Sequence, residues 1–139
     1  MRGVRVWARL IGLQRTVVEN VRIGSEGEVI VSARPSWRER DRCGVCRRRS
    51  PGYDLGEGRR RWRALDLGTA FAFVEADAPR VSCRCHGVVV CAVPWARHDS
   101  RFTRSFEDQV VRHEALLNRV GCRSPPPGCR SSSVKRGAA

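Results

Sequence analysis

The chain has almost no lysine: Lys135 is the only one in a sequence of 139 residues with 27 basic side chains. Arginine therefore supplies nearly all of the positive charge, and with 14 acidic residues the net charge is +13. A GC-rich genome would favour arginine codons over lysine codons, but it would not explain the net charge. A field of this sign attracts polyanions, and arginine forms planar, bidentate phosphate and guanine contacts that lysine cannot. Composition thus predicts nucleic acid as the partner.

Long apolar runs are also lacking. No stretch approaches the roughly 20 apolar residues of a membrane-spanning helix, and residues 1–13 lack the continuous apolar region of a signal peptide. We therefore expect a cytoplasmic protein that binds neither a membrane nor a small-molecule substrate. Seven cysteines in that setting indicate thiols and metal ligands rather than a disulfide framework, and their odd number leaves at least one unpaired.

Aromatic residues are scarce too, at 6% of the chain. A small domain with so modest a core often needs a metal ion to stabilise it. β-Branched runs nevertheless predict strands, which form one hairpin over 16–23 and 28–33, a second pair over 61–67 and 69–76, and a third β stretch over 81–91 that is broken at 83–86. No internal repeat is visible.

One helix is predicted, over 105–120, with Ser105 as its N-cap and Asp108 completing a start that resembles a capping box. The segment 121–139 is rich in Pro, Ser and Gly and is expected to be disordered. The expected fold is a small β-rich α+β protein, divided into an N-terminal β-hairpin (1–34), a zinc-ribbon-like DNA-binding domain (35–100), one C-terminal helix (101–120) and a disordered tail (121–139).

Two short segments carry paired metal ligands. Cys43-Gly-Val-Cys46 places two thiols two residues apart with glycine between them, and Cys83-Arg-Cys-His86 offers Cys83 and His86 at the same spacing. Three cysteines and one histidine form a common closed, tetrahedral zinc site. The 36 residues between the pairs hold the predicted strands, so a zinc-ribbon-like arrangement of two knuckles around one zinc ion is expected.

Other assignments of these residues stay open. A redox C-x-x-C motif would be followed by a helix in a βαβ unit, whereas Cys43 follows a charged loop. Cys85 could replace Cys83 or His86 as a ligand, although a Cys83/Cys85 pair has a strained bite. His98 is an outside candidate for a ligand. The remaining cysteines are expected not to bind metal, Cys91 as a buried small apolar residue and Cys122 and Cys129 in the tail.

Arginines cluster beside the first cysteine pair and at the start of the next strand. We expect phosphate contacts from seven of them: Arg47, Arg48, Arg49, Arg59, Arg60, Arg61 and Arg63. Trp62 or Trp37 could stack on a base or sugar, although Trp62 is better placed in the core. Charge runs are often only solvated faces, but here the net charge favours nucleic acid.

A series of motifs, in order and at matching spacing, resembles the N-terminal part of the zinc-finger insertion-sequence transposases of the ISL-three family. The resemblance covers roughly residues 6–110, in the motifs Cys43-Gly-Val-Cys46, Pro51-Gly-Tyr-Asp54, Arg60-Arg-Trp-Arg-Ala-Leu-Asp66, Pro79-Arg-Val-Ser-Cys83, His86-Gly-Val-Val-Val90, Val93-Pro-Trp-Ala-Arg97, Phe102-Thr103 and Phe106-Glu-Asp-Gln109. Cys85 departs from the family pattern. After Val110 the resemblance stops, which leads to the hypothesis that the gene is truncated or frameshifted near that residue.

The resemblance implies a DNA-binding zinc finger that recognises the terminal inverted repeats of a transposon, with Cys43, Cys46, Cys83 and His86 as ligands. In the family a helix-turn-helix region and a DDE catalytic domain follow, with three carboxylates that hold two metal ions. We see neither here and expect a nucleoid-associated bacterial module without transposition activity. Three alternatives remain: a protein-interaction module that docks on or inhibits an intact transposase, an RNA-binding zinc protein, and a pseudogene product.

Overall fold

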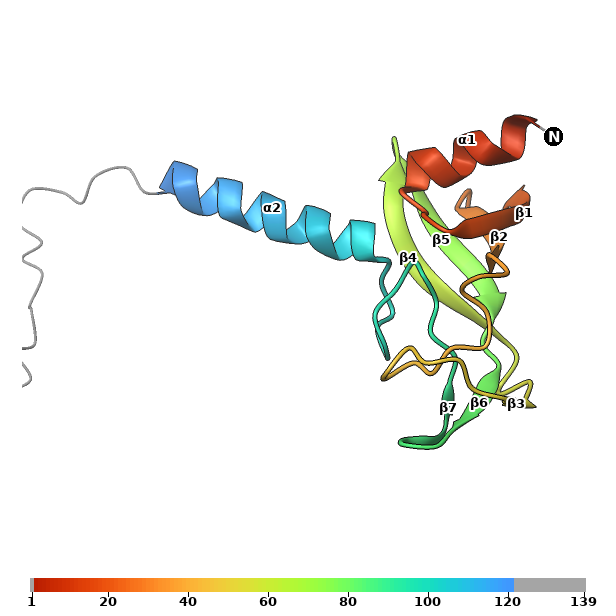
Figure 1. Cartoon of the computed structure of the whole chain (residues 1–139). Coiled ribbons are helices and arrows are strands. Elements are labelled where there is room, and N and C mark those ends of the chain that lie inside the picture. The colour runs from red at the N-terminus through yellow and green to blue at the C-terminus, as the bar shows by residue number, and fades with distance from the viewer. Residues whose placement is uncertain (1, 122–139) are drawn as a thin grey trace, which may run out of the picture.

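We describe the chain from a computed structural model, which covers residues 2–121, with side chains over 3–117. Two helices and seven strands follow one another in it (Figure 1). Their bounds are α1 Arg2–Ile11, β1 Thr16–Ile23, β2 Val29–Pro35, β3 Gly52–Asp54, β4 Arg59–Leu67, β5 Ala70–Asp77, β6 Arg80–Cys83, β7 Gly87–Val90 and α2 Arg104–Gly121. The β-rich, zinc-ribbon-like fold class is confirmed. The tail expected to be disordered lies, from residue 122, outside the described residues.

The larger sheet has four strands in the order β1-β2-β5-β4. β1 and β2 form one antiparallel hairpin and β4 and β5 another, as the β-branched runs predict. The hairpins join through parallel pairing of β2 with β5, in which Val31 lies beside Val74. Residues 16–35 therefore share one sheet with residues 59–77, across the expected division at 34/35.

The core lies on one face of this sheet. Alternate residues of the strands point into it, among them Val31, Trp62 and Val74, all at most 3% exposed. Trp95, from the segment after β7, closes the core, and its ring meets that of Trp62 edge-on at 5.4 Å between centroids. Trp62 is thus a core residue, the placement favoured by the sequence.

The sequence-based prediction missed helix α1. Its inward residues Val4, Trp7, Ala8 and Ile11 have helical spacing and pack against the core. Gly12 ends the helix in a left-handed conformation, with φ at 72°, while Leu13 N–H donates to the Ala8 carbonyl at 2.7 Å. Residues 2–121 therefore contain two helices, not one, and the first element among them is helical.

A smaller sheet of three strands, ordered β3-β6-β7, carries the cysteine region. β6 and β7 form a tight antiparallel hairpin, and the short β3, which was not predicted, pairs with β6. Among the described residues, its apolar cluster has three buried members: Cys43, Val81 and Cys83. So small an apolar cluster cannot hold the region together alone, which agrees with the need for a metal.

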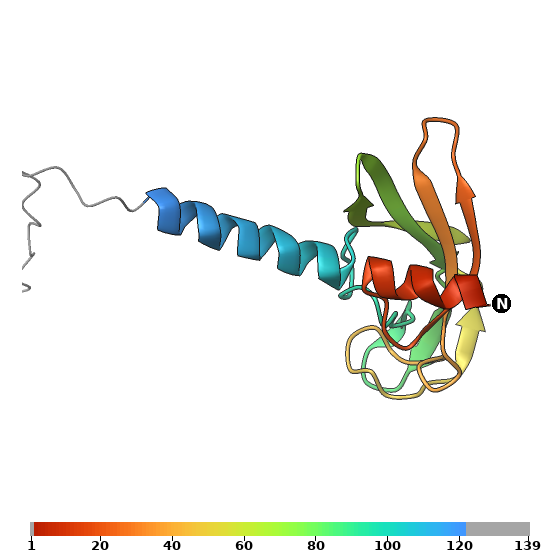
Figure 2. The same ribbon diagram turned by 90° about the horizontal axis from the view of Figure 1, so that it is seen from above.

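Helix α2 extends away from the sheets in both views (Figures 1 and 2). It begins at Arg104 and is capped by Thr103, whose Oγ1 accepts from Phe106 N–H at 3.3 Å. Ser105, predicted as the cap, instead donates its hydroxyl to the Gly12 carbonyl at 3.1 Å and ties the two helices together. No helix within the described residues is long and apolar enough to cross a membrane.

Candidate metal centre

The first knuckle is the loop that carries Cys43 and Cys46, between β2 and β3. Its turn closes through two backbone hydrogen bonds, from Cys43 N–H to the Arg48 carbonyl and from Arg47 N–H to the Cys43 carbonyl, both 2.9 Å long. Val45 N–H also points at the Cys43 sulfur, 3.4 Å away. Arg47 adopts a left-handed backbone with φ at 61° to complete the turn. Both sulfurs are thereby directed to one side of the loop.

The second knuckle is the turn between β6 and β7. Cys83 is the last residue of β6 and pairs with Gly87, the first residue of β7, whose φ of 71° suits glycine at this tight corner. His86 immediately precedes it. The hairpin thus presents one sulfur and one imidazole to the first knuckle.

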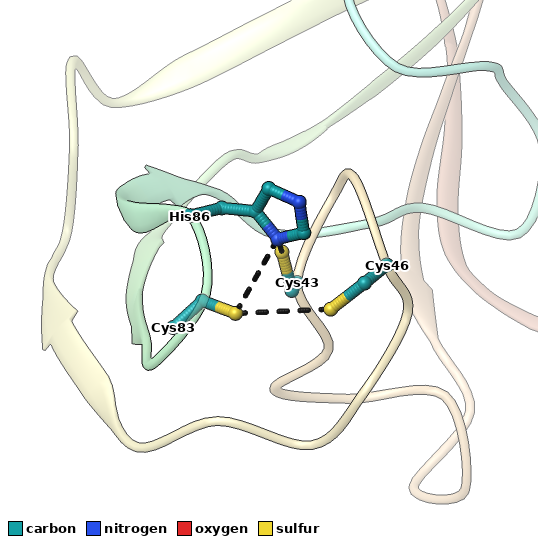
Figure 3. A group of neighbouring side chains, drawn as sticks. All are labelled: Cys43, Cys46, Cys83 and His86. Carbon is teal, nitrogen blue, oxygen red and sulfur yellow. Dashed lines mark hydrogen bonds between the residues drawn. The ribbon is translucent and has the colours of Figure 1, made fainter.

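The four predicted ligands converge, as Figure 3 shows. One ligand atom from each of Cys43, Cys46, Cys83 and His86 lies within 4.8 Å of all the others. The Cys46 and Cys83 sulfurs are 3.7 Å apart, and His86 Nδ1 lies 3.8 Å from the Cys43 sulfur and 3.6 Å from that of Cys83. A tetrahedron with Zn–S bonds of ~2.3 Å has edges of about 3.8 Å, so these separations fit a zinc ion.

Electrostatics at the site favour a thiolate at Cys83. Hydrogen bonds from the backbone of Cys85 and from the His86 side chain lower the pKa of Cys83 to about 6. The pKa of Cys46 is raised, because burial and the neighbouring thiols of Cys43 and Cys83 outweigh the hydrogen bond from the Arg48 backbone, which alone would lower it. One sulfur is therefore ready for a cation near neutral pH, and Zn²⁺ would take up the proton's place on the others.

Nearby candidates lie outside the ligand group. Cys85 is exposed between Cys83 and His86, and its side chain does not join the cluster. Cys91 is half-buried, and burial raises its pKa to about 11, which keeps it a neutral thiol. His98, the outside candidate, packs against Gly44 and pairs with Asp99, its Nε2 lying 3.3 Å from the carboxylate.

Gly44 is a structurally constrained position, which the sequence shows only as the glycine inside the C-x-x-C pair. A Cβ there would lie 2.5 Å from the Val90 carbonyl oxygen and 2.5 Å from His98 Nδ1. The first knuckle thus sits directly on β7 and needs a residue without a side chain. The glycine inside the C-x-x-C motif is the only sequence feature that indicates this constraint. The residues that cause it, Val90 and His98, lie 46 and 54 residues further along the chain.

The structure places the predicted arginines in two groups. Arg47, Arg48 and Arg49 are exposed on the first knuckle beside the metal ligands. Arg49 donates to the carbonyl of Trp37, whose ring is 67% exposed. Both lie on the loop before β3, so an exposed indole accompanies this group.

The second group, on β4, is divided by strand alternation. Arg59, Arg61 and Arg63 lie on the sheet face away from the core, whereas Arg60 lies on the core side, where it covers Trp62 and donates to the Ser100 carbonyl. Arg59 and Arg61 contact Glu75. Arg63 bonds to Asp66 and lies against Phe71, with its guanidinium 4.1 Å from the ring centroid.

Comparison with known proteins gives a family match for the region that carries the four converging side chains. Residues 39–86 match the model of the zinc-finger of transposase IS204/IS1001/IS1096/IS1165. The chain is also 46% identical over 117 residues to the transposase for insertion sequence element IS1557 of Mycobacterium tuberculosis, in strains CDC 1551 / Oshkosh and ATCC 25618 / H37Rv. This alignment covers 80% of the chain but 26% of the relative. No solved structure matches the chain significantly.

Proposed function

Because residues 39–86 carry the zinc finger of the IS204/IS1001/IS1096/IS1165 transposases, we propose that this zinc-binding, transposase-derived chain is a DNA-binding module for transposon ends. The convergence of Cys43, Cys46, Cys83 and His86 within 4.8 Å carries the proposal. The bound zinc ion would hold the two knuckles together as a rigid base, and the residues around it would contact the DNA.

The charges around the site support this use. Three thiolates and Zn²⁺ leave the metal centre with one negative charge, yet exposed Arg47, Arg48 and Arg49 follow it directly in the chain. Arg48 keeps its side chain without a hydrogen bond to a described residue, so its guanidinium is available for a phosphate. Trp37 adds an exposed ring to the same loop. Phosphate contacts from this loop would position the module on a duplex.

The binding test compares two labelled duplexes by fluorescence anisotropy, one with the terminal inverted repeat of IS1557 and one with the same bases shuffled. We expect tighter binding to the repeat and a steep loss of affinity with salt. Arg48→Ala should flatten the slope of log K against log[salt] by about 0.9, the value of one phosphate contact. Arg5→Ala, which removes the same charge from the solvent face of α1, serves as the control.

Equal affinity for both duplexes would remove the assignment to transposon ends. Binding that is insensitive to salt and to Arg48→Ala would contradict the phosphate-contacting role of the knuckle.

We further propose that the described region has no transposition activity of its own. Several of its acidic side chains are paired with arginines: Asp54 with Arg80, Asp66 with Arg63, and Glu75 with three. Such pairing suits turns and surfaces rather than a site for two metal ions. A strand-transfer assay with Mg²⁺ or Mn²⁺ and the same repeat should give no product, and product formation would contradict this part of the proposal.

A second candidate function is docking on an intact transposase. The apolar residues of α2 favour it, since Val110, Val111, Leu116 and Leu117 are 42–64% exposed on a helix that extends from the sheets (Figure 2). Apolar docking should change little with salt, unlike phosphate binding. Co-purification with a tagged full-length relative at low and moderate salt, with Leu117→Asp as the disrupting variant, separates the two functions.

A further inference from the structure

The four-stranded sheet has a second face that the zinc site does not explain. Because Trp62, Ala72 and Val74 point into the core, the alternate residues of β4 and β5 point to the opposite face. The strand register shows that this face continues from β4 to β1. Arg63 of β4 pairs with Phe73 of β5, which pairs with Ile30 of β2. Ile30 in turn pairs with Arg22 of β1. Helix α1 and the segment with Trp95 pack on the core side. On the second face Ile30 is buried at 1% exposure, whereas Phe71 is 57% exposed.

A single carboxylate gathers three arginines on this face. Glu75 receives Arg61 Nε at 2.9 Å, Arg59 Nε at 3.0 Å and a terminal nitrogen of Arg22 at 3.1 Å. The arginine side chains are 44–49% exposed, whereas that of Glu75 is 12% exposed. The carboxylate thus lies below a layer of guanidinium groups that face solvent.

The cluster keeps a surplus of positive charge and of donors. Although burial alone would raise the pKa of Glu75, the guanidinium groups of Arg61, Arg22 and Arg59 hold it below its usual value, so the carboxylate stays ionised. The three guanidinium groups face the single negative charge of Glu75. A second carboxylate, that of Asp77, lies 3.8 Å from Arg59, so the cluster still has one more positive than negative charge. Arg61 uses only Nε, and its two terminal nitrogens make no hydrogen bond to a described residue. They are available for a phosphate oxygen.

An exposed aromatic ring lies on the same face. Phe71, two residues before Phe73 on β5, is 57% exposed. The Arg63 guanidinium covers part of its ring and also approaches Phe73, 5.4 Å from that centroid, so the pair of rings is held in place. Aromatic rings on an open sheet bind bases by stacking, which requires bases that are not already stacked in a duplex.

We propose that this open sheet face, formed by Arg22, Arg59, Arg61, Phe71 and Glu75, binds single-stranded DNA. Arg22, Arg59 and Arg61 contact the backbone, Phe71 stacks on a base, and Glu75 is a positioning residue that spreads the arginines. The inference rests on the proposed DNA-binding function and extends it, because the knuckle arginines contact duplex backbone while the sheet face takes an unpaired strand.

The experiment measures binding of the zinc-loaded full chain to a labelled 20-nucleotide strand and to the same strand annealed as a duplex. Phe71→Ala should weaken single-strand binding by about tenfold, the scale of one lost stacking contact, and duplex binding by less than about twofold. Phe71→Tyr, which keeps the ring, should bind like the unmodified chain. Arg22→Ala should lower the salt slope on the single strand by about 0.7.

Two controls isolate the sheet face. Leu55→Ala removes an exposed apolar side chain, 81% exposed, from the region of the smaller sheet, and Arg5→Ala removes one charge from α1. Neither should change single-strand affinity more than about twofold. Zinc content and circular dichroism of each variant report folding separately.

The outcomes separate the two proposals. Duplex binding that weakens with Arg48→Ala, together with single-strand binding that is absent or indifferent to Phe71→Ala and Arg22→Ala, overturns the sheet-face inference and leaves the proposed function standing. Equal losses on both substrates with Phe71→Ala also overturn it. Failure to bind either substrate overturns the proposed function itself.

Discussion

Gly44 shows how much of the metal centre depends on one position without a side chain. Its Cα faces the Val90 carbonyl, and Val90 is held in β7 by pairing with Arg80. The carbonyl therefore cannot move aside without disturbing the hairpin that carries Cys83 and His86. The fit between the knuckles is set by backbone contact as well as by the ligands themselves.

Gly44→Ala should lower zinc affinity by at least about tenfold, since forcing an extra carbon into a filled space costs ~1–3 kcal/mol and 1.4 kcal/mol corresponds to a factor of ten. Competition against a chromophoric zinc chelator measures the effect. Gly52→Ala is the matched control, because a Cβ at Gly52 meets no atom within 4 Å. His98→Ala combined with Gly44→Ala should not restore affinity, because the contact with the Val90 carbonyl remains. Unchanged zinc affinity in Gly44→Ala would mean that the knuckles are not packed as described.

The sequence predicted the four side chains that converge because their signal is local: the two members of each pair lie within four residues of each other. Neighbours far along the chain gave no such signal. Arg22 and Glu75 are 53 residues apart and were not linked by any motif. The arginines of 59–63 could be divided between two faces only once β4 was placed in register with β5.

At the scale of elements, helix α1 contributes one of the most deeply buried side chains. Ile11 is fully buried against the sheet, whereas its neighbour Leu10 is 56% exposed. Ile11→Ala should lower the free energy of unfolding by about 2–4 kcal/mol through lost burial and the cavity that remains. Leu10→Ala should change it by less than about 0.5 kcal/mol. Urea unfolding at constant zinc concentration measures both, and similar values for the two variants would show that α1 does not dock as described.

Helix α1 could have been found from the sequence, since Val4, Trp7, Ala8 and Ile11 have helical spacing and Gly12 supplies a stop. The N-cap of α2 could not be predicted from the local sequence, because Thr103 and Ser105 are both good N-cap residues. The hydrogen bond from the Ser105 hydroxyl to the Gly12 carbonyl, which comes from a distant part of the chain, leaves Thr103 as the cap. Hairpin strands were predicted to within two residues because turn residues and β-branched runs coincide there.

At the scale of the whole molecule, the two sheets differ in how they are stabilised. The four-stranded sheet and α1 share a core of fourteen buried residues, whereas the small sheet has three. The parallel pairing of β2 with β5 that unites the large sheet links distant segments and has no local sequence pattern, so it could not be predicted. We therefore expect a bound metal ion to stabilise the small sheet, which lacks a core, and to matter less for the large one.

Removal of zinc should accordingly open the small sheet and leave the large one folded. A strong chelator removes the ion that joins Cys43, Cys46 and Cys83, and the small apolar burial of this sheet then favours the open form. Hydrogen exchange followed by mass spectrometry should show amides of β6 and β7 exchanging at least about tenfold faster, with those of β2 and β5 nearly unchanged.

Cys83→Ser supplies an independent route to the same state, because it removes a ligand without a chelator. Its exchange pattern in the presence of zinc should match that of the chelated chain, with loss confined to residues 39–54 and 80–91. Loss of protection in β2 and β5 as well would mean that the sheets unfold as one cooperative unit, in which case zinc stabilises the whole molecule. Selective loss would instead show that zinc stabilises only the region that carries Arg47, Arg48 and Arg49. Chelation should then abolish duplex binding and leave the open face of the large sheet intact.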